Sequence, residues 1–457
     1  IEPVTGSTHT FGFALTEAGD RFTVTTTVPG IFIAPLPWHY LARNPNAATP
    51  RVEAPTGDRR AYAISKPHPW RQKRADDPEY FRYYNSRYGA AESEAEGWFT
   101  ALCGPLVYQD HALPGLHGHY LVCEPAGNLI HRARIVRDGP ALLLERVPGE
   151  ERAEFAASTD AWTHPVSLAH GPDGSLWITD YYREIIEDYS AIPRHLQQQY
   201  GLYHGNDRGR IYRLTHRDLP SPPPAGMARL SSAALARECN APLFWRRQTA
   251  QRLLLERNAL EAVPDLRSLL VAPDTSPAAT IVLLRTLDAL GALTHSDLRP
   301  FLTHTSPPVR IHALQLADAK LARDAGSALI EPLLDASRTE SDPRVQLQFA
   351  LSLGESRDPR AFGELARLAR RHLDIRWMAA AILSSVHNRE ADLLAELLRE
   401  PGQSADILTP LAEAIAASRD ETQLARVLRL LGYAPEPVQV TVMQGLANGR
   451  RNAPRLP

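Results

Sequence analysis

Cysteine is scarce in this chain of 457 residues, which contains only three, and none lies in a CxxC, CxxCH or cysteine–histidine pattern with zinc spacing. The sequence therefore encodes neither haem attachment nor a structural zinc site. No apolar run approaches the roughly 20 residues that span a bilayer, and no signal-like segment opens the chain. A Gly-rich phosphate loop, a GxSxG elbow, an HExxH helix and an EF-hand loop are also missing, so the common catalytic signatures are absent.

A strong charge of one sign is missing too. The formal net charge is -2, which gives no long-range field to gather polyanions, so we expect no nucleic-acid partner. The hydrophobic fraction of 44% and the charged fraction of 22% are typical of a globular protein. A chain of this length suits two or three domains rather than a single core.

Short β-like runs fill the first half of the chain in three units. The clearest unit covers residues 162–214 and contains an Asp-Gly hairpin signal, while the others cover 104–145 and 10–35. Repeats of roughly 40 to 50 residues with up to four strands each are typical of propeller blades. We therefore predict a partial β-propeller of about three blades over residues 1–215.

Residues 44–100 interrupt these units with polar and aromatic sequence that lacks a steady period. We predict a long excursion between blades, which is either a functional cover or poorly ordered. A proline-rich linker follows at 216–228, because stacked prolines favour extended polyproline II. Beyond it, residues 229–457 place Leu, Ala and Arg at helical spacing, in pairs that recur roughly every 30 to 36 residues.

This second half resembles HEAT-type repeats, several of which begin with a proline at the helix entrance. The fold prediction is therefore a multidomain β + α protein, with the partial propeller followed by a HEAT-like α-solenoid. Because the chain opens on Ile1 in the middle of a sheet pattern, we expect further N-terminal blades and any export signal to lie outside it.

Polar residues near the ends of the predicted strands are candidates for a site, because a propeller presents such side chains to its central channel. Glu124 and Asn128 bracket a turn and form a candidate acid–amide pair. Asp180 ends a strand, and Arg183 follows it closely. His164 precedes a strand and is a candidate general base, while Arg208 lies at the glycine-flanked start of the last strand.

Each candidate also has a structural interpretation. Asn128 can cap its turn, and Asp180 and Arg183 can pair with each other. Arg208 can tie two blades together, and a single histidine such as His164 is more often a hydrogen-bonded structural residue than a base.

Two further features leave alternatives open. The aromatic patch at 35–40 can stack on a flat ligand, or its Trp38 can pack against a neighbouring blade. Cys103 and Cys123 flank a predicted hairpin, which would place their sulfurs opposite each other. They form either a cross-strand disulfide or two reduced buried cysteines.

Five segments resemble the family of PVC-type haem-binding, membrane-bound dehydrogenase-like proteins: ALCGPLVY (101–108), LVCEPAGNLIHR (121–132), PVSLAHGPDGSLWITDYYR (165–183), GNDRGRIYR (205–213) and WRRQTAQRLLLER (245–257). The resemblance covers nearly the whole chain. It implies a propeller akin to the soluble quinoprotein sugar dehydrogenases, then HEAT repeats and a C-terminal cytochrome c module. It also implies export to the periplasm or cell surface. The chain departs from this pattern, since it lacks the haem module and the blades that would complete the quinone pocket.

The resemblance implies a quinone-dependent sugar or alcohol dehydrogenase-like protein that passes electrons to a c-type haem absent here. Pyrroloquinoline quinone and calcium are its implied cofactors, and a sugar or polyol is its implied substrate. The residues assigned to this hypothesis are His164, Asp180 and Arg183 for catalysis and Glu124, Asn128 and Arg208 for cofactor binding, with no residue assigned to a metal. The alternative is a non-catalytic scaffold that holds a glycan on the propeller or a protein partner on the solenoid.

Overall fold

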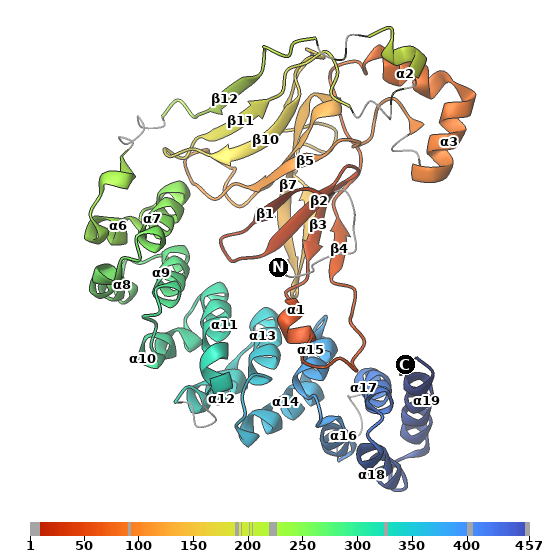
Figure 1. Ribbon diagram of the computed structural model, residues 1–457, viewed down its shortest axis with the longest axis vertical. Coiled ribbons are helices and arrows are strands. Elements are labelled where there is room, and N and C mark those ends of the chain that lie inside the picture. Colours follow the sequence, from red (N-terminus) through yellow and green to blue (C-terminus); the bar gives the residue numbers. More distant parts are fainter. Residues whose placement is uncertain are drawn as a thin grey trace. The chain divides into compact units, whose positions relative to one another are not determined.

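The computed structural model describes residues 10–89, 93–187, 192, 194–200, 202, 204–218, 226–323, 328–399 and 405–452. They divide into a β unit, within Thr5–Ala34 and Glu53–Arg257, and a helical unit, within Pro35–Val52 and Asn258–Pro457. Strands dominate the first and helices the second (Figure 1). The predicted mixed β and α class is therefore confirmed.

The first sheet has four antiparallel strands in the order β1-β2-β3-β4. They are β1 (Thr10–Leu15), β2 (Arg21–Thr25), β3 (Val28–Ile33) and β4 (Glu53–Thr56). The excursion predicted at 44–100 contains part of this sheet, because β4 lies inside it and pairs Glu53 with Ile33. The strand signal is weak there since Pro55 interrupts it, and a proline is tolerated only because β4 is an edge strand.

The second and third sheets are also antiparallel. The second has the order β5-β6-β7-β8, with β9 paired to β7, and the third has the order β10-β11-β12. Their bounds are β5 (Cys103–Val107), β6 (Tyr120–Glu124), β7 (Leu129–Asp138), β8 (Ala141–Arg146), β9 (Ala156–Ala157), β10 (Pro165–His170), β11 (Leu176–Asp180) and β12 (Arg210–Leu214). In the described part of the chain the three sheets do not join into a closed ring.

Aromatic and aliphatic side chains fill the space between neighbouring sheets. Tyr120 of β6 packs against Phe22, and its buried hydroxyl donates to the carbonyl of Pro29 at 2.7 Å. Between the second and third sheets, Leu121 and Leu176 belong to one cluster of buried apolar residues. Successive side chains of β6 point to opposite faces of the second sheet and are all buried, so this strand contributes to the apolar core on both sides.

The segment that follows β4 contains two helices, α2 (Pro69–Asp76) and α3 (Pro78–Tyr88). Each begins with a proline at its first position, where the missing N–H costs nothing. The residue before each proline caps the helix: His68 accepts from the N–H of Trp70 at 3.3 Å, and Asp77 accepts from Glu79 at 2.9 Å. These local signals give helices to part of the predicted excursion, which the sequence left open as either a functional cover or a poorly ordered segment.

The described helices of the second half form two layers, since α9, α11, α13, α15, α17 and α19 pack in succession, as do α12, α14, α16 and α18 (Figure 1). Proline begins several of them, and Asp342 and Asp358 cap α13 and α14. Their bounds, with those of the flanking helices, are α6 (Ser232–Glu238), α7 (Phe244–Glu256), α8 (Val263–Leu270), α9 (Pro277–Ala289), α10 (His295–Leu298), α11 (Pro307–Arg323), α12 (Ile330–Thr339), α13 (Pro343–Leu353), α14 (Pro359–Arg371), α15 (Met378–Ser385), α16 (Glu390–Leu398), α17 (Ala405–Ser418), α18 (Glu421–Leu431) and α19 (Glu436–Asn452). The sequence pattern missed α17, which contains Pro410, a residue that normally breaks a helix interior.

The division into units differs from the predicted domains in two places. The helices α6 and α7 belong to the β unit, where Phe244 donates its N–H to the buried Asp110 at 2.6 Å. The segment Pro35–Val52 belongs to the helical unit and contains the short helix α1 (Trp38–Leu41). Trp38 of this helix is 43% exposed. Most of the predicted linker, 219–225, lies outside the described residues.

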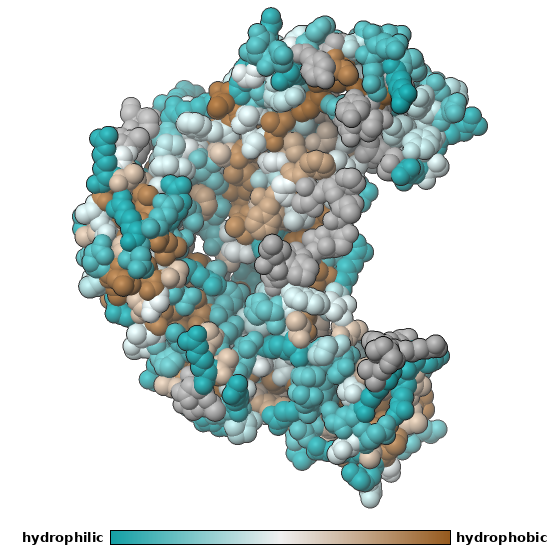
Figure 2. Space-filling model, in the orientation of Figure 1, coloured by the Kyte–Doolittle hydropathy of each residue, from teal (hydrophilic) through white to brown (hydrophobic). Residues whose placement is uncertain are grey.

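The surface is uneven in hydropathy. Figure 2 shows hydrophobic residues gathered over the strands and a mostly hydrophilic surface over α12, α14 and α16. Phe11, Phe13 and Leu15 project from one face of β1 and are about half exposed. Among the described residues, no helix has the length and apolar character needed to cross a bilayer.

Substitution of Gly104 by alanine should destabilise the β unit. Gly104 of β5 has φ +55°, and a Cβ atom there would lie 2.4 Å from the carbonyl oxygen of Val166 in β10. Gly115 has φ +70° but open space around the same position, so Gly115→Ala is the matched control for backbone strain alone. We expect Gly104→Ala to lower the free energy of unfolding by at least about 2 kcal/mol more than Gly115→Ala, measured by calorimetry. Equal losses would contradict the close sheet contact.

Candidate functional site

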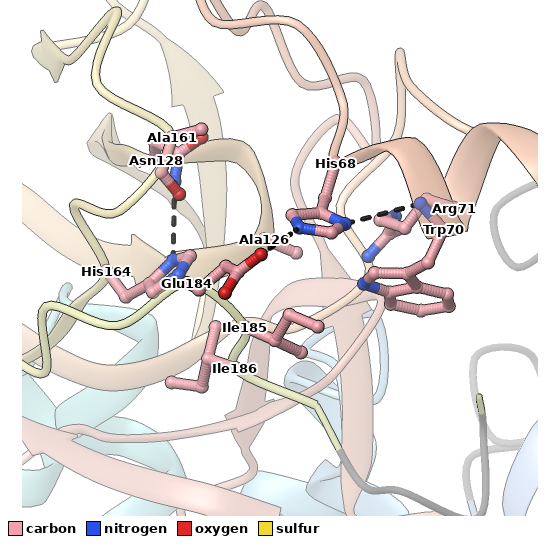
Figure 3. Close-up of a pocket in the computed structure, with 10 residues that line it drawn as sticks. All are labelled: His68, Trp70, Arg71, Ala126, Asn128, Ala161, His164, Glu184, Ile185 and Ile186. Carbon is pink, nitrogen blue, oxygen red and sulfur yellow. Dashed lines mark hydrogen bonds and ion pairs between the residues drawn. The ribbon is translucent and has the colours of Figure 1, made fainter. Parts of the chain in front are cut away.

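A hollow in the β unit lies where α2 begins and where the second and third sheets end, and it holds about 320 Å³ of empty space, part of it open to solvent (Figure 3). The turn η1 (Pro125–Gly127), the loop before β10 and the loop after β11 form its walls. Its polar lining residues are His68, Arg71, Asn128, His164 and Glu184. Two predicted residues, Asn128 and His164, thus meet three that the sequence did not single out.

His164 is held firmly in this hollow. Its backbone N–H donates to the carboxylate of Asp180 at 2.7 Å, and its Nδ1 lies 2.7 Å from the carbonyl oxygen of Pro125. That contact requires a proton on Nδ1 and leaves Nε2 as the lone-pair nitrogen of a neutral ring. Nε2 is buried and has no hydrogen-bond partner among the described residues. Burial lowers the pKa of His164, while the backbone of Pro125, the charge of Asp180 and the nearby backbone of Arg183 oppose the shift, so the ring is neutral at pH 7.

Asn128 has a structural role beside it. The residue adopts a left-handed conformation with φ 56°, which an asparagine tolerates at the end of a turn. Its Nδ2 donates to the carbonyl of Thr163 at 2.6 Å, and its Oδ1 accepts from the hydroxyl of Ser65 at 2.6 Å. The Asn128 amide also lies 3.3 Å from Nδ1 of His164 (Figure 3). Asn128 therefore positions the loop that holds His164.

His68 and Glu184 face each other across the hollow. The Nε2 of His68 lies 3.9 Å from Oε1 of Glu184, and its Nδ1 is occupied as the cap of α2. Burial lowers the pKa of His68, Glu184 opposes this, and the nearby His164 adds to it. The hollow therefore contains two imidazole rings that burial disfavours as cations.

Arg71 supplies the permanent positive charge. It is only 6% exposed, and its Nη2 donates to the hydroxyl of Thr100 at 2.9 Å. Its Nη1 is 4.0 Å from a carboxylate oxygen of Glu187, and its buried Nε has no partner in the part of the chain that the structure describes. Arg71 also lines a second hollow of about 320 Å³, next to Trp98. The guanidinium of Arg71 thus borders two hollows, and its Nε–H is a donor without a partner among the described residues.

Glu124 lies behind this guanidinium and is 1% exposed. Its Oε2 accepts from the N–H groups of Thr100 and Ala101, each at 3.0 Å, whereas Oε1 has no partner among the described groups. Burial raises the pKa of Glu124 to about 7, although the backbone donors of Ala101, Thr100 and Ala126 and the charge of Arg71 favour its ionised form. Glu124 is therefore only partly ionised near neutral pH.

The other predicted residues have different surroundings. Asp180 is 1% exposed, and it accepts from Tyr182 N–H at 2.9 Å and from the Tyr212 hydroxyl at 3.2 Å, in addition to His164. Its carboxylate is therefore fully used in fixing the end of β11. The guanidinium of Arg183 stacks on Tyr181 at 4.5 Å and does not line the hollow.

Arg208 lies apart from the other candidates. Its side chain is 64% exposed, and the nearest carboxylate oxygen, of Asp207, is 3.9 Å away. Neither Arg183 nor Arg208 lines the hollow, although Glu184, Ile185 and Ile186 of the same connection between β11 and β12 do. The six candidates thus do not form one cluster.

The residues missed by the sequence analysis come from two irregular segments. His68 and Arg71 lie in the excursion, where the His-Pro-Trp signal of a capped helix start was present but was not interpreted. Glu184 follows the Asp-Tyr-Tyr-Arg string, and no local pattern distinguishes it from a solvated acid.

The cysteines and acids offer no metal site among the described residues, where no group of three or more metal-binding side chains occurs. Cys103 lies opposite Cys123 in the β5–β6 ladder, as predicted for this hairpin, and both are free thiols. Burial raises the pKa of Cys103 to about 12, so its thiol is not ionised at neutral pH.

Residues 1–218 match a family model described as a domain of unknown function (DUF7133). The match covers the three sheets and all the residues of the hollow. No curated protein matches the chain.

Replacement of Glu124 by glutamine should remove part of the pH dependence of stability. A carboxyl whose pKa is raised in the folded protein stabilises the fold while it is protonated. For Glu124 this contribution is lost as pH rises from 4.5, the ordinary pKa of the carboxyl, to about 7, its pKa in the folded protein. Relative to the wild type, Glu124→Gln should gain about 2 kcal/mol in unfolding free energy between pH 5 and pH 8, measured by urea unfolding. The exposed Glu145→Gln is the control. If the difference in unfolding free energy between Glu124→Gln and the wild type is the same at pH 5 and pH 8, as expected for the control, the pKa of Glu124 is not shifted.

Proposed function

We propose that the β unit binds one small polyhydroxylated molecule, of the sugar or polyol class, in the hollow beside His164. One observation supports this most directly: two buried nitrogens of lining residues, Nε of Arg71 and Nε2 of His164, have no partner among the described residues. Leaving such groups unpaired costs roughly 1–3 kcal/mol each. A hydroxyl both donates and accepts, so a polyol can satisfy a donor and an acceptor at once.

The rest of the lining fits a small molecule of this class. The enclosed part of the hollow is small, about 20 Å³, which is room for about one water-sized group. The ligand would therefore place one hydroxyl there, with the rest of the molecule in the part that is open to solvent. Trp70 and Ile185 offer apolar surface for C–H groups, and Glu184 offers acceptors for further hydroxyls. Arg71 supplies charge-assisted donors, which would also suit a carboxylate on the same ligand.

We further infer that the three sheets are blades of an incomplete propeller and that the helical layers are HEAT-like repeats. Repeated antiparallel sheets that pack face to face support the first inference, and paired helices that begin at prolines support the second. The resemblance to PVC-type dehydrogenase-like proteins adds an expectation of export. These inferences agree with a binding role, because propellers commonly place ligands near the ends of their strands.

Oxidation of the bound hydroxyl is the second candidate function, and the state of His164 favours it. A neutral ring with a free Nε2 can accept the proton of an alcohol. The residues predicted to hold a quinone do not fit that role, because Glu124 and Asn128 are bonded to backbone groups and Arg208 is exposed. Binding without oxidation is therefore the function that the geometry supports better.

The binding proposal predicts that sugars or polyols bind the full chain and that Arg71→Gln weakens them. Loss of one charge-assisted hydrogen bond should raise Kd by roughly 10- to 100-fold. Saturation-transfer NMR over a panel of monosaccharides, sugar acids and polyols identifies a ligand, and calorimetric titration measures its Kd. The exposed Arg134→Gln is the matched control and should leave Kd unchanged. If no member of the panel binds at millimolar concentration, or if both variants behave alike, the proposal is wrong.

The oxidation candidate has its own test. The full chain is mixed with pyrroloquinoline quinone and calcium, and sugar-dependent reduction of a dye is followed. On this hypothesis the wild type reduces dye, and His164→Gln loses at least about tenfold in rate because the proton acceptor is gone. A ligand that binds but never supports dye reduction would eliminate oxidation and leave the binding function standing.

A further inference from the structure

A strap, defined here as the segment Pro35–Val52, connects β3 to β4 but belongs to the helical unit. Its short helix α1 packs against α15 (Figure 1). Tyr40 and Asn44 of the strap are each only 1% exposed. The strap is therefore inserted into the helical unit by its polar side chains and does not lie loosely on its surface.

Tyr40 is the first anchor. Its hydroxyl donates to the carboxylate of Asp318 on α11 and accepts from Nε2 of Gln348 on α13 at 3.0 Å. One side chain thus bridges two successive helices of the same layer.

Arg43 is the second anchor. Its Nη1 donates to the carbonyl of Leu351 at 2.8 Å and to Glu355 at 3.0 Å, and its Nη2 donates to the hydroxyl of Ser385 at 2.8 Å. Gly354 leaves room for this guanidinium, because a Cβ atom there would lie 2.7 Å from Nη1. The helical unit therefore has a fitted site for an arginine.

Asn44 is the third anchor. Its Nδ2 donates to the carbonyl of Leu383 at 2.9 Å and to the buried Glu390 at 3.0 Å. Together the three anchors contact α11, α13, α15 and the first residue of α16. The strap occupies this surface as a peptide ligand would, joined covalently to its receptor.

Asp318 and Glu390 each keep one buried carboxylate oxygen without a hydrogen-bond partner among the described residues at this contact. In Asp318, Oδ2 accepts from Tyr40, and the oxygen without a partner is Oδ1. Burial raises the pKa of Asp318 to about 7; Glu355 also raises it, whereas Tyr40, Ser352 and Arg43 favour the ionised form.

The charged groups facing Asp318 come from three elements. The strap contributes Arg43, which is already paired with Glu355 at the end of α13. Helix α9 contributes Arg285, whose guanidinium donates to His312 at 2.9 Å and to Gln315. Neither arginine forms an ion pair with Asp318 among the described contacts, so burial outweighs their attraction.

We propose that the strap is a pH-dependent latch: it is the resident peptide ligand of this helix surface, docked in acidic solution and loosened as pH rises. Release would uncover the surface of α11, α13 and α15, which is the part of the helical unit best suited to a protein partner with a tyrosine and an arginine three residues apart.

The direction follows from the carboxyl of Asp318. In the docked state its pKa is about 7, whereas a hydrated aspartate has its ordinary value of 3.8. A group whose pKa is raised in the docked state favours docking while it is protonated, and this preference disappears as pH rises from about 4 to about 7. Between pH 5 and pH 8 the docking constant should therefore fall by a factor of roughly 10 to 100.

Hydrogen exchange with mass spectrometry on the full chain tests the latch. Peptides covering 35–52 should lose roughly 10- to 100-fold in protection factor between pH 5 and pH 8, after correction for the intrinsic rate. Asp318→Asn mimics the protonated carboxyl and should make this protection independent of pH. The exposed Asp274→Asn is the matched control and should behave like the wild type.

A second variant keeps the test decisive if Asp318→Asn does not fold. Gly354→Ala crowds both Ser385 of α15, 2.4 Å from the added Cβ atom, and Arg43 of the strap. Because both groups belong to the Arg43 anchor, the protection of 35–52 should fall at every pH, while α18 remains protected. Protection of the strap that is equal at pH 5 and pH 8 in the wild type overturns the latch. Protection that falls equally in Asp318→Asn overturns the role of Asp318.

Discussion

The pairing of β3 with β4 constrains the whole chain. Antiparallel neighbours are usually joined by a short hairpin. Here Ile33 is held opposite Glu53, and the strap that connects them is part of the helical unit. Closing this loop costs conformational entropy, which the buried contacts of the three strap anchors offset. The ladder between β3 and β4 and the anchors of the strap together close this long connection.

The hollow of the β unit likewise depends on buried polar residues whose hydrogen bonds hold the surrounding loops. Asp180 uses all its oxygens on the backbone of His164 and on two tyrosines, and Asn128 uses its amide on carbonyls of the same loop. These structural residues fix the ring of His164 and leave its Nε2 free. The sequence correctly located the turn and the strand ends but assigned chemistry to residues that position others.

Local sequence patterns predicted most of the helices and strands but few of the hydrogen bonds between residues that are distant in the sequence. The Asp-Gly turn between β10 and β11 and the prolines that begin α13 and α14 are signals within a few residues, and the elements formed where those signals lay. The hydrogen bond from Tyr40 to Asp318 joins residues 278 positions apart. No period or motif encodes such a contact, because it depends on how whole elements pack. The same reason hid His68 and Arg71, whose helix is ordered by its caps but whose role comes from the loops around it.

The buried polar atoms that lack hydrogen bonds differ between the two units, and different groups can satisfy them. In the hollow, a donor on Arg71 and an acceptor on His164 are both unpaired among the described residues, and a proton cannot satisfy the two together, whereas a ligand with several hydroxyls can. Beneath the strap the unpaired atoms among the described residues are acceptors only, one carboxylate oxygen each of Asp318 and Glu390, and a proton removes the charge of such a group without any ligand. Mixed donor and acceptor deficits thus favour a binding site, while buried carboxylates alone favour a response to pH. The chemistry of what is left unpaired, rather than the size of either cavity, distinguishes the two roles.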